Sequence, residues 1–185
     1  MKCGISDMCV SEVTGVEDPE DRAFKALRGP WAGTPNHLDA PFWATPEPVV
    51  ERMLDLAGVA PGDHLIDLGC GDGRIVIAAA RRGASALGID IDPERIAEAE
   101  AAARAAGVEH LARFRAEDLF ATRLEAASIV TLYLVPHVNH MLATRLRTEL
   151  APGSRVVSHG FAMRDWEPRV HETVDRFALY LWVVD

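Results

Sequence analysis

The sequence predicts an α/β fold in which helices cover both faces of a mostly parallel β-sheet. Short apolar runs alternate with segments of helical spacing between residues 45 and 158, which is the βαβ pattern of parallel sheets. One apolar run, 65–68, passes through three glycines directly into a helix. The last two runs, 170–174 and 177–184, are too close together for a crossover helix. They predict a terminal hairpin, so the last strand is expected to be antiparallel.

Residues 1–44 are expected to form an N-terminal extension before a single domain at 45–185. Glycine and proline interrupt the extension repeatedly, and it shows no sustained periodicity. Asp18 is a candidate N-cap for a short helix that ends at Leu27. The apolar anchors that would let the extension fold over the domain as a lid are Trp31, Phe42 and Trp43. A partly disordered tail is an equal alternative for roughly the first fifteen residues.

The ordered part of the chain is predicted to begin with a helix at Thr45. Thr45 is a candidate N-cap, Pro46 suits the first helical position, and Glu47 is an acidic residue in the first turn. Gly58 is expected to close this helix.

The later elements follow from the same signals. Asp92 is a candidate N-cap for an alanine-rich helix that stops at Gly107. The other expected strands lie at 86–90, 112–116, 129–134 and 155–158. One further helix is expected to begin at Arg74, and another is expected to run from Pro136 to Leu150.

Composition limits the classes of partner. A formal net charge of −9 argues against a broad nucleic-acid surface, because binding to nucleic acid depends on Lys and Arg that neutralise phosphates. A basic partner fits better, although an acidic balance that only maintains solubility is an equal alternative. No apolar run is long enough to span a bilayer, so no membrane partner is expected. The sequence does not predict an oligomeric state.

The cysteines indicate a reducing location. Cys3, Cys9 and Cys70 form an odd set without a CxxC pair, which favours the cytoplasm and argues against disulfides or structural zinc. His137 and His140 lie three positions apart on a predicted helix, but no Cys, Asp or Glu is spaced to complete a metal site. No metal is therefore expected.

The glycine turn is the main candidate for a binding site. Gly69, Gly71 and Gly73 lack a Cβ atom, so a ligand can approach the main chain closely. The turn opens a helix, whose first N–H groups favour a carboxylate or phosphate. This pattern is typical of a nucleotide-binding turn. The alternative is a turn that only joins a strand to a helix.

Further acidic residues are expected at the same edge of the sheet, because ligands of such folds bind beyond the carboxyl ends of the strands. Asp90 ends the second strand and suits the hydroxyls of a ribose, with Ile91 next to it on the edge. Glu117 and Asp118 follow the third strand, where a carboxylate can accept a hydrogen bond from the exocyclic amine of adenine.

The spacing of the glycines separates two classes of cofactor. A dinucleotide fingerprint requires G-x-G-x-x-G, whereas residues 67–73 read D-x-G-x-G-x-G. In this motif the sequence resembles the class I S-adenosylmethionine-dependent methyltransferases. The resemblance implies a Rossmann-like three-layer sandwich with strand order 3-2-1-4-5-7-6 and an antiparallel seventh strand. It also implies that Asp90 binds the ribose, Asp118 lies near adenine, and the turn from Asp67 through Asp72 to Gly73 surrounds the methionyl moiety.

A narrower resemblance extends from Pro41 onward. It rests on PFWATPE at 41–47, GDGRIV at 71–76, LYLVP at 132–136, RVVSH at 155–159 and DWEP at 165–168. These motifs resemble the protein-lysine methyltransferases related to the ATP synthase c-subunit lysine methyltransferase and the archaeal broad-specificity lysine methyltransferase. The similarity implies that the Thr45 segment closes over the methionyl end and that the acceptor enters near Tyr133 and the loop from His159 to Trp166. Gly160 departs from the family, because many relatives have an acidic residue there.

The function expected from these features is N-methylation of lysine in a protein by S-adenosylmethionine, with S-adenosylhomocysteine as the product. Tyr133 is a candidate to align the amine, and His159 is a candidate proton acceptor. Their alternatives are an aromatic that closes the core and a structural hydrogen bond. Methylation of a small-molecule amine or hydroxyl, and a non-catalytic cofactor-binding sensor or scaffold, are the competing functions. The glycine spacing disfavours a nicotinamide dehydrogenase.

Overall fold

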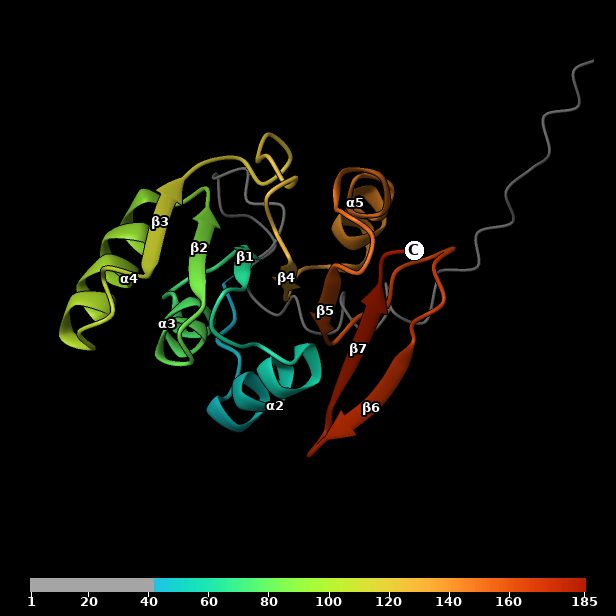
Figure 1. Ribbon diagram of the computed structural model, residues 1–185, viewed down its shortest axis with the longest axis horizontal. Coiled ribbons are helices and arrows are strands. Elements are labelled where there is room, and N and C mark those ends of the chain that lie inside the picture. Colours follow the sequence, from blue (N-terminus) through green and yellow to red (C-terminus); the bar gives the residue numbers. More distant parts are fainter. Residues whose placement is uncertain (1–41) are drawn as a thin grey trace, which may run out of the picture. The chain divides into compact units, whose positions relative to one another are not determined.

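The computed structural model describes residues 42–185, which form a seven-stranded sheet flanked by helices (Figure 1). The predictions for Cys3, Cys9, Asp18–Leu27 and Trp31 lie outside the described residues. The helices are α2 (Glu47–Ala57), α3 (Arg74–Arg81), α4 (Pro93–Ala105) and α5 (Pro136–Glu149). The strands are β1 (His64–Leu68), β2 (Ser85–Asp90), β3 (Ala112–Ala116), β4 (Ile129–Leu132), β5 (Arg155–His159), β6 (Val170–Val174) and β7 (Phe177–Val183).

The sheet has the expected strand order, β3-β2-β1-β4-β5-β7-β6. β1 to β5 pair in parallel, whereas β7 is antiparallel to both β5 and β6. The predicted terminal hairpin and the antiparallel last strand are therefore confirmed. The strand order reverses between β1 and β4, which places the switch point of the sheet beside the glycine turn.

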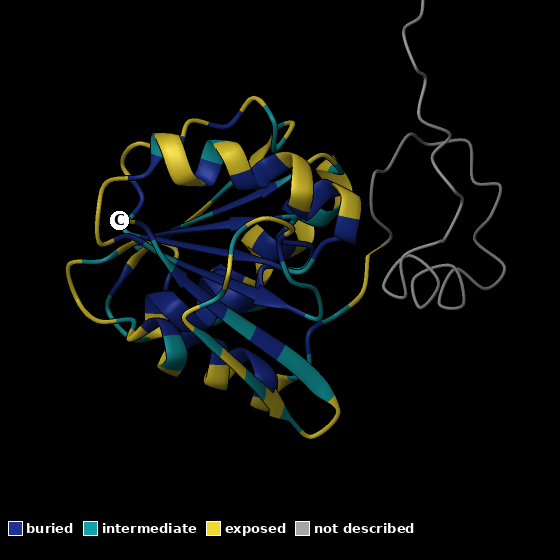
Figure 2. Cartoon of the chain, turned by 90° about the vertical axis from the view of Figure 1, so that its right-hand side faces the viewer, coloured by how far each residue is buried: buried dark blue, intermediate teal, exposed yellow. Residues whose placement is uncertain are grey.

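The helices form a layer on each face of the sheet. α2 packs against α3, β5 and β7, and α3 also packs against α4. α5 lies across the sheet from α2 and α3 (Figure 1). The central strands are buried, and α2, α4 and α5 each have a buried and an exposed side, whereas α3 is buried along most of its length (Figure 2). This burial explains the continuous apolar runs in β1 and β4, because both faces of these strands are covered.

β4 is shorter than the sequence predicts. It ends at Leu132 rather than at residue 134, because Leu132 pairs with Leu68, the last residue of β1. Beyond this point β1 no longer continues as a partner for β4. Tyr133 therefore lies just past the end of the strand, at the edge where ligands of such sheets bind.

The prediction that Thr45 caps α2 is wrong. The helix begins at Glu47, Pro46 occupies the N-cap position with an extended ψ of 145°, and no side chain caps it within the described residues. Thr45 is thus one residue too early to reach the first helical amides. Its buried hydroxyl contacts the imidazole of His159 instead.

Two other predicted helix boundaries are confirmed. Gly58 closes α2 in the left-handed conformation, with φ of 63°. Asp92 caps α4 by accepting a hydrogen bond from the amide of Glu94. Among residues 42–185, no helix combines the length and apolar character needed to cross a lipid bilayer.

Candidate active site

The glycine turn between β1 and α3 is the centre of the site. Gly69, Gly71 and Gly73 have φ of 80°, 51° and 79°, a backbone region that other residues rarely adopt. A Cβ atom at Gly71 would overlap the ring of Phe42, and one at Gly73 would lie 2.6 Å from the ring of Phe114. The turn therefore requires glycine for conformation and for space, and it lies at the N-terminus of α3, where free N–H groups favour an anion.

Asp90 lies directly beside this turn. One carboxylate oxygen accepts the amide of Gly71 at 2.8 Å, and the other accepts the amide of Asp92 at 3.0 Å. The carbonyl of Asp90 accepts the amide of Glu117 at 2.9 Å. The ends of β1, β2 and β3 therefore bring the glycines, Asp90 and Glu117 together, as the sequence predicts. Ile91 is exposed next to Asp90 and offers an apolar surface.

The electrostatics of the turn favour a ligand with positive charge. Asp67 is 2% exposed, and burial raises the pKa of its carboxyl to about 7, helped by the charges of Asp90 and Asp72 and opposed by a 2.7 Å hydrogen bond from Thr131. A ligand ammonium or sulfonium beside these carboxylates would favour the ionised form of Asp67. A pyrophosphate would add negative charge to the same place. These carboxylates fit the positive charges of S-adenosylmethionine better than they fit a dinucleotide, and the carboxylate of S-adenosylmethionine suits the start of α3.

Cys70 is an inert member of the turn. Burial, together with the charges of Asp67 and Asp90, raises the pKa of its thiol far above the ordinary value. The free, buried thiol therefore stays protonated at neutral pH and has no role as a nucleophile.

Arg74 connects the turn to the segment before α2. Its guanidinium pairs with Asp72, with Nε at 2.9 Å from Oδ1, and donates from Nη1 to the carbonyl of Thr45 at 2.8 Å. Burial would raise the pKa of Asp72, but the hydrogen bonds and charge of Arg74 lower it. We did not predict this residue. An arginine in the first turn of a helix opposes the macrodipole, and this mismatch is the sequence signal that a carboxylate partner is present.

Two aromatic rings stack where β4 and β5 end. The centroids of Tyr133 and His159 are 3.7 Å apart with an interplanar angle of 28°, and Phe177 meets the imidazole edge-on at 5.0 Å. His159 is fully buried, its Nδ1 lies 3.2 Å from the hydroxyl of Thr45, and its Nε2 has no partner among residues 42–185. Burial lowers the pKa of the imidazole to about 4, so it is neutral at pH 7.

The two halves of the site meet at Thr45. Its carbonyl accepts from Arg74 of the glycine turn, and its hydroxyl contacts His159 of the aromatic pair. Phe42 precedes this segment and lies under the guanidinium of Arg95 at 4.3 Å, beside Gly71. Arg95 and Phe42 were not predicted as site residues, because spacing along the chain does not show that α4 reaches the segment before α2.

Residues 42–185 contain no group of three or more His, Cys, Asp or Glu side chains placed to hold an ion. His137 and His140 are both exposed on α5.

This sheet order, together with a D-x-G-x-G-x-G turn and an acidic residue at the end of β2, defines an S-adenosylmethionine-dependent methyltransferase. The profile of the ANTKMT methyltransferase domain matches residues 67–170, and the chain belongs to this family. It is an enzyme that takes its methyl group from S-adenosylmethionine.

Three relatives of the chain have names that specify lysine as the methylated residue. A protein-lysine N-methyltransferase of Saccharolobus islandicus is 42% identical over 150 residues, which cover 78% of this chain and 93% of that protein. The adenine nucleotide translocase lysine N-methyltransferase of Mus musculus is 35% identical over 149 residues, covering 79% of this chain and 65% of that protein. The ATP synthase c-subunit lysine N-methyltransferase of the same species is 38% identical over 128 residues, which cover 69% of this chain and about half of that protein, 51%.

A solved structure supports the cofactor and differs in the named substrate. A protein from Salinibacter ruber, described as an RNA methyltransferase in complex with S-adenosyl-L-homocysteine, superposes with a TM-score of 0.75 and 48% identity. The match covers 77% of this chain and 94% of that one.

Proposed function

We propose that the enzyme methylates the side-chain amine of lysine in a protein. The observation that carries the proposal is the stacked pair of Tyr133 and His159, which lies at the carboxyl edge of the sheet and is joined through Thr45 to the glycine turn. Tyr133 is half-buried, so its ring can line a channel while its hydroxyl faces an incoming amine. The lysine methyltransferases among the relatives support this choice of acceptor.

The methyl donor is proposed to lie along the ends of β1, β2 and β3. Gly69, Gly71, Asp72 and Gly73 would surround its methionyl carboxylate, with Asp67 near the ammonium. Asp90 would accept from the ribose hydroxyls, and Ile91 would pack against the adenine. Glu117 and Asp118 would accept from the exocyclic amine of the base, and Thr45 would close the methionyl end. When bound, S-adenosylmethionine supplies an electrophilic methyl group on its sulfonium.

The residues at the acceptor side have to deliver a neutral amine. Lysine has an ordinary pKa near 10.4, and a channel that excludes water favours loss of the proton to bulk water as the side chain enters. Burial raises the pKa of Tyr133, and its phenol oxygen can accept a hydrogen bond from an N–H of the amine, which leaves the nitrogen lone pair free to attack the methyl group. The methyl transfer itself is an in-line displacement, so holding the amine at about 3 to 3.5 Å from the methyl carbon is the main task of the protein.

His159 is proposed to position Tyr133 rather than to accept the proton of the substrate. Its imidazole is fully buried and a weak base in this environment, since burial lowers its pKa to about 4. Its contacts with Thr45 and with the ring of Tyr133 suit a residue that fixes its neighbours.

Methylation of RNA is the second candidate, because the Salinibacter protein is described as acting on RNA. The charge of this chain disfavours it. A net charge of −9 and carboxylates at the ends of β1, β2 and β3 repel a phosphate backbone and attract a lysine-rich segment. We therefore propose a basic protein partner and no nucleic-acid partner. The lid role of residues 1–44 and the cytoplasmic location remain predictions.

Transfer of a labelled methyl group separates the candidates. The purified enzyme is incubated with methyl-labelled S-adenosylmethionine and cell extract, and the product is divided into samples treated with protease or with ribonuclease. The proposal predicts label that protease releases and ribonuclease does not. Release by ribonuclease would support RNA instead, label in small molecules would indicate a metabolite acceptor, and cofactor binding without any transfer would indicate a sensor.

A further inference from the structure

Arg145 of α5 binds the loop that follows β3. Its Nη1 donates to the carbonyl of Phe120 at 2.8 Å and to that of Leu119 at 3.4 Å, and its Nη2 donates to the carbonyl of Thr122 at 2.7 Å. On its other side the guanidinium is held by Glu149 of the same helix, at 2.6 Å from Nε and 2.7 Å from Nη2. One side chain thus uses its planar set of donors to bind three carbonyls of a single loop.

The same loop carries Asp118, the proposed adenine ligand. At one end the amide of Glu117 bonds to Asp90, and at the other end Thr122 and Leu124 are buried. Between these points Asp118 is exposed. Its carbonyl accepts from Ala121 and from the hydroxyl of Thr122, and its Oδ1 accepts the amide of Phe120. The orientation of the carboxylate therefore depends on the turn 118–122, to which Arg145 donates from outside.

Arg145 is positively charged in this environment. Hydrogen bonding to Glu149 raises the pKa of the guanidinium, and the charge of Asp118 adds to this effect. The hydrogen bonds from Arg145 lower the pKa of Glu149. Both partners are ionised at neutral pH, so the bonds to the loop are charge-assisted.

We infer that Arg145 is a positioning residue for adenine recognition, which sets the place of the Asp118 carboxylate from α5 without touching the cofactor. This inference rests on the proposed contact between Asp118 and the adenine amine. Loss of the guanidinium frees the turn 118–122, so the carboxylate no longer lies in one place. Discrimination at the exocyclic amine should then weaken together with affinity.

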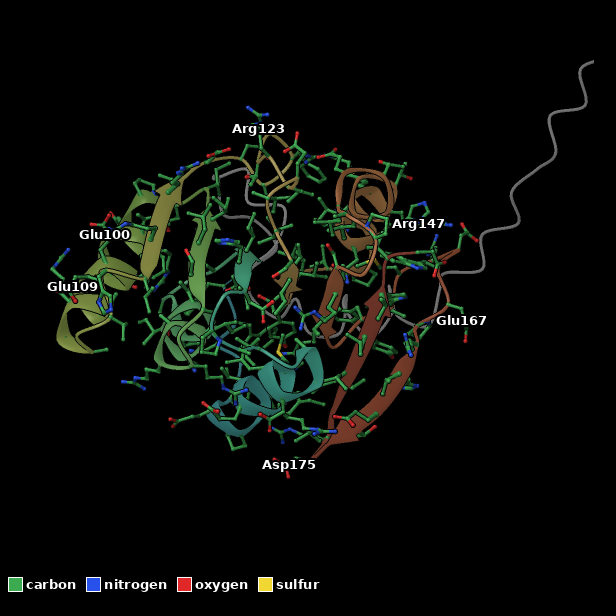
Figure 3. All side chains as sticks on the ribbon, in the orientation of Figure 1. Glu100, Glu109, Arg123, Arg147, Glu167 and Asp175 are labelled. Atoms are coloured by element: carbon green, nitrogen blue, oxygen red, sulfur yellow. The ribbon has the colours of Figure 1, made fainter. Side chains whose placement is uncertain are left out.

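The test compares two ligands in calorimetry, S-adenosylhomocysteine and its inosine analogue, which has a carbonyl in place of the amine. The variants are Arg145→Ala, Arg145→Lys and Glu149→Gln, with Arg123→Ala as the matched control. Arg123 lies in the same loop, but its side chain is 87% exposed and points away from the sheet (Figure 3). No acceptor is needed, so the result does not depend on the proposed lysine substrate.

Arg145→Ala should bind S-adenosylhomocysteine about tenfold more weakly, the loss expected for one hydrogen bond to a charged group. For this variant, the ratio of the affinities for S-adenosylhomocysteine and for its inosine analogue should fall to near unity. Arg145→Lys and Glu149→Gln retain packing and should show an intermediate loss, and they carry the test if Arg145→Ala does not fold. Arg123→Ala should equal the wild type.

Asp118→Ala tests the premise separately, because alanine has no acceptor for the exocyclic amine. An unchanged preference for adenine in this variant would contradict the contact with the base. A preference that is lost in Asp118→Ala but intact in all variants of Arg145 and Glu149 would overturn the positioning role, even if those variants melt at lower temperature.

Discussion

The hydroxyl of Thr45 lies 3.2 Å from Nδ1 of His159, so the segment before α2 is joined to the end of β5, 114 positions later. The same threonine accepts a hydrogen bond from Arg74 through its carbonyl. Thr45 therefore contacts both Arg74, which follows the glycine turn, and His159 of the aromatic pair. We expect the two halves of the active site to depend on this contact.

Replacing Thr45 with valine should lower kcat more than it weakens the binding of S-adenosylmethionine. The variant loses the hydroxyl that holds His159 but retains the carbonyl bonded to Arg74. A neutral hydrogen bond predicts a loss of about fivefold in rate. Steady-state kinetics measure this, and Thr45→Ser, which keeps the hydroxyl, is the control. Equal kcat values for Thr45→Val and the wild type would show that the contact does not matter for catalysis.

Gly160→Ala should disturb Tyr133 as well as the backbone. Gly160 has φ of 86°, and a Cβ atom there would lie 3.3 Å from Cε2 of Tyr133. Gly153 is a matched control, because its φ is 85° and nothing lies within 4 Å of the added atom. Chemical denaturation should show a loss of about 1 kcal/mol for the backbone conformation in both variants.

Methyl transfer should then decrease in Gly160→Ala and stay near the wild-type rate in Gly153→Ala. Similar activities in the two variants would argue that the ring of Tyr133 needs no fixed position. The contact also explains in physical terms why an acidic side chain at position 160 would require a different placement of Tyr133.

The buried imidazole of His159 should make the protein less stable in mild acid. Its pKa is near 6.5 in the unfolded chain and about 4 in the fold, so the unfolded state takes up the proton first. The free energy of unfolding that depends on the neutral imidazole is fully present above pH 6.5 and is lost as pH falls from 6.5 toward 4. It amounts to about 3 kcal/mol, since one pKa unit corresponds to about 1.4 kcal/mol.

Urea denaturation at several pH values measures this effect. The difference in unfolding free energy between the wild type and His159→Gln should shrink across this range, because glutamine does not titrate. Parallel curves for the two proteins would contradict a depressed pKa at His159.

Asp90→Asn should weaken the binding of S-adenosylhomocysteine by about tenfold or more, as expected when a hydrogen bond to a charged group is lost. The carboxylate accepts amides from Gly71 and Asp92, and an asparagine NH₂ group would face one of these donors. Asp92→Ser provides the control, because serine also caps helices and this side chain bonds to Glu94. Calorimetry that gives equal affinities for Asp90→Asn and Asp92→Ser would remove Asp90 from the ribose site.

The sequence predicted the helices, the strands and the meeting of the glycine turn with Asp90 because the relevant signals are local. The three glycines, the acid at Asp90 and the hairpin after Val170 are all visible within short windows, and the structure places them as expected. The strand order came from the resemblance of the motifs, since periodicity does not determine which strands are neighbours.

Contacts between distant segments could not be predicted in this way. Thr45 is a residue type that often caps helices, but its hydroxyl contacts the buried imidazole of His159 instead. Pro46, with an extended ψ of 145°, is the N-cap, so the helix starts only at Glu47. The same limit applies to Arg145, which lies 23 positions from Thr122. Such partners depend on tertiary packing across the sheet.

The most direct test of the proposed function is amino-acid analysis of proteins modified by the purified enzyme. Basic cell proteins freed of RNA are incubated with S-adenosylmethionine and the enzyme, then hydrolysed and analysed by mass spectrometry. We predict N-methylated lysine with the wild type and much less of it with Asp90→Ala at a limiting concentration of S-adenosylmethionine. Transfer that yields methylated nucleosides or small molecules from whole extract, with no methyl-lysine in the protein fraction, would contradict the proposed function.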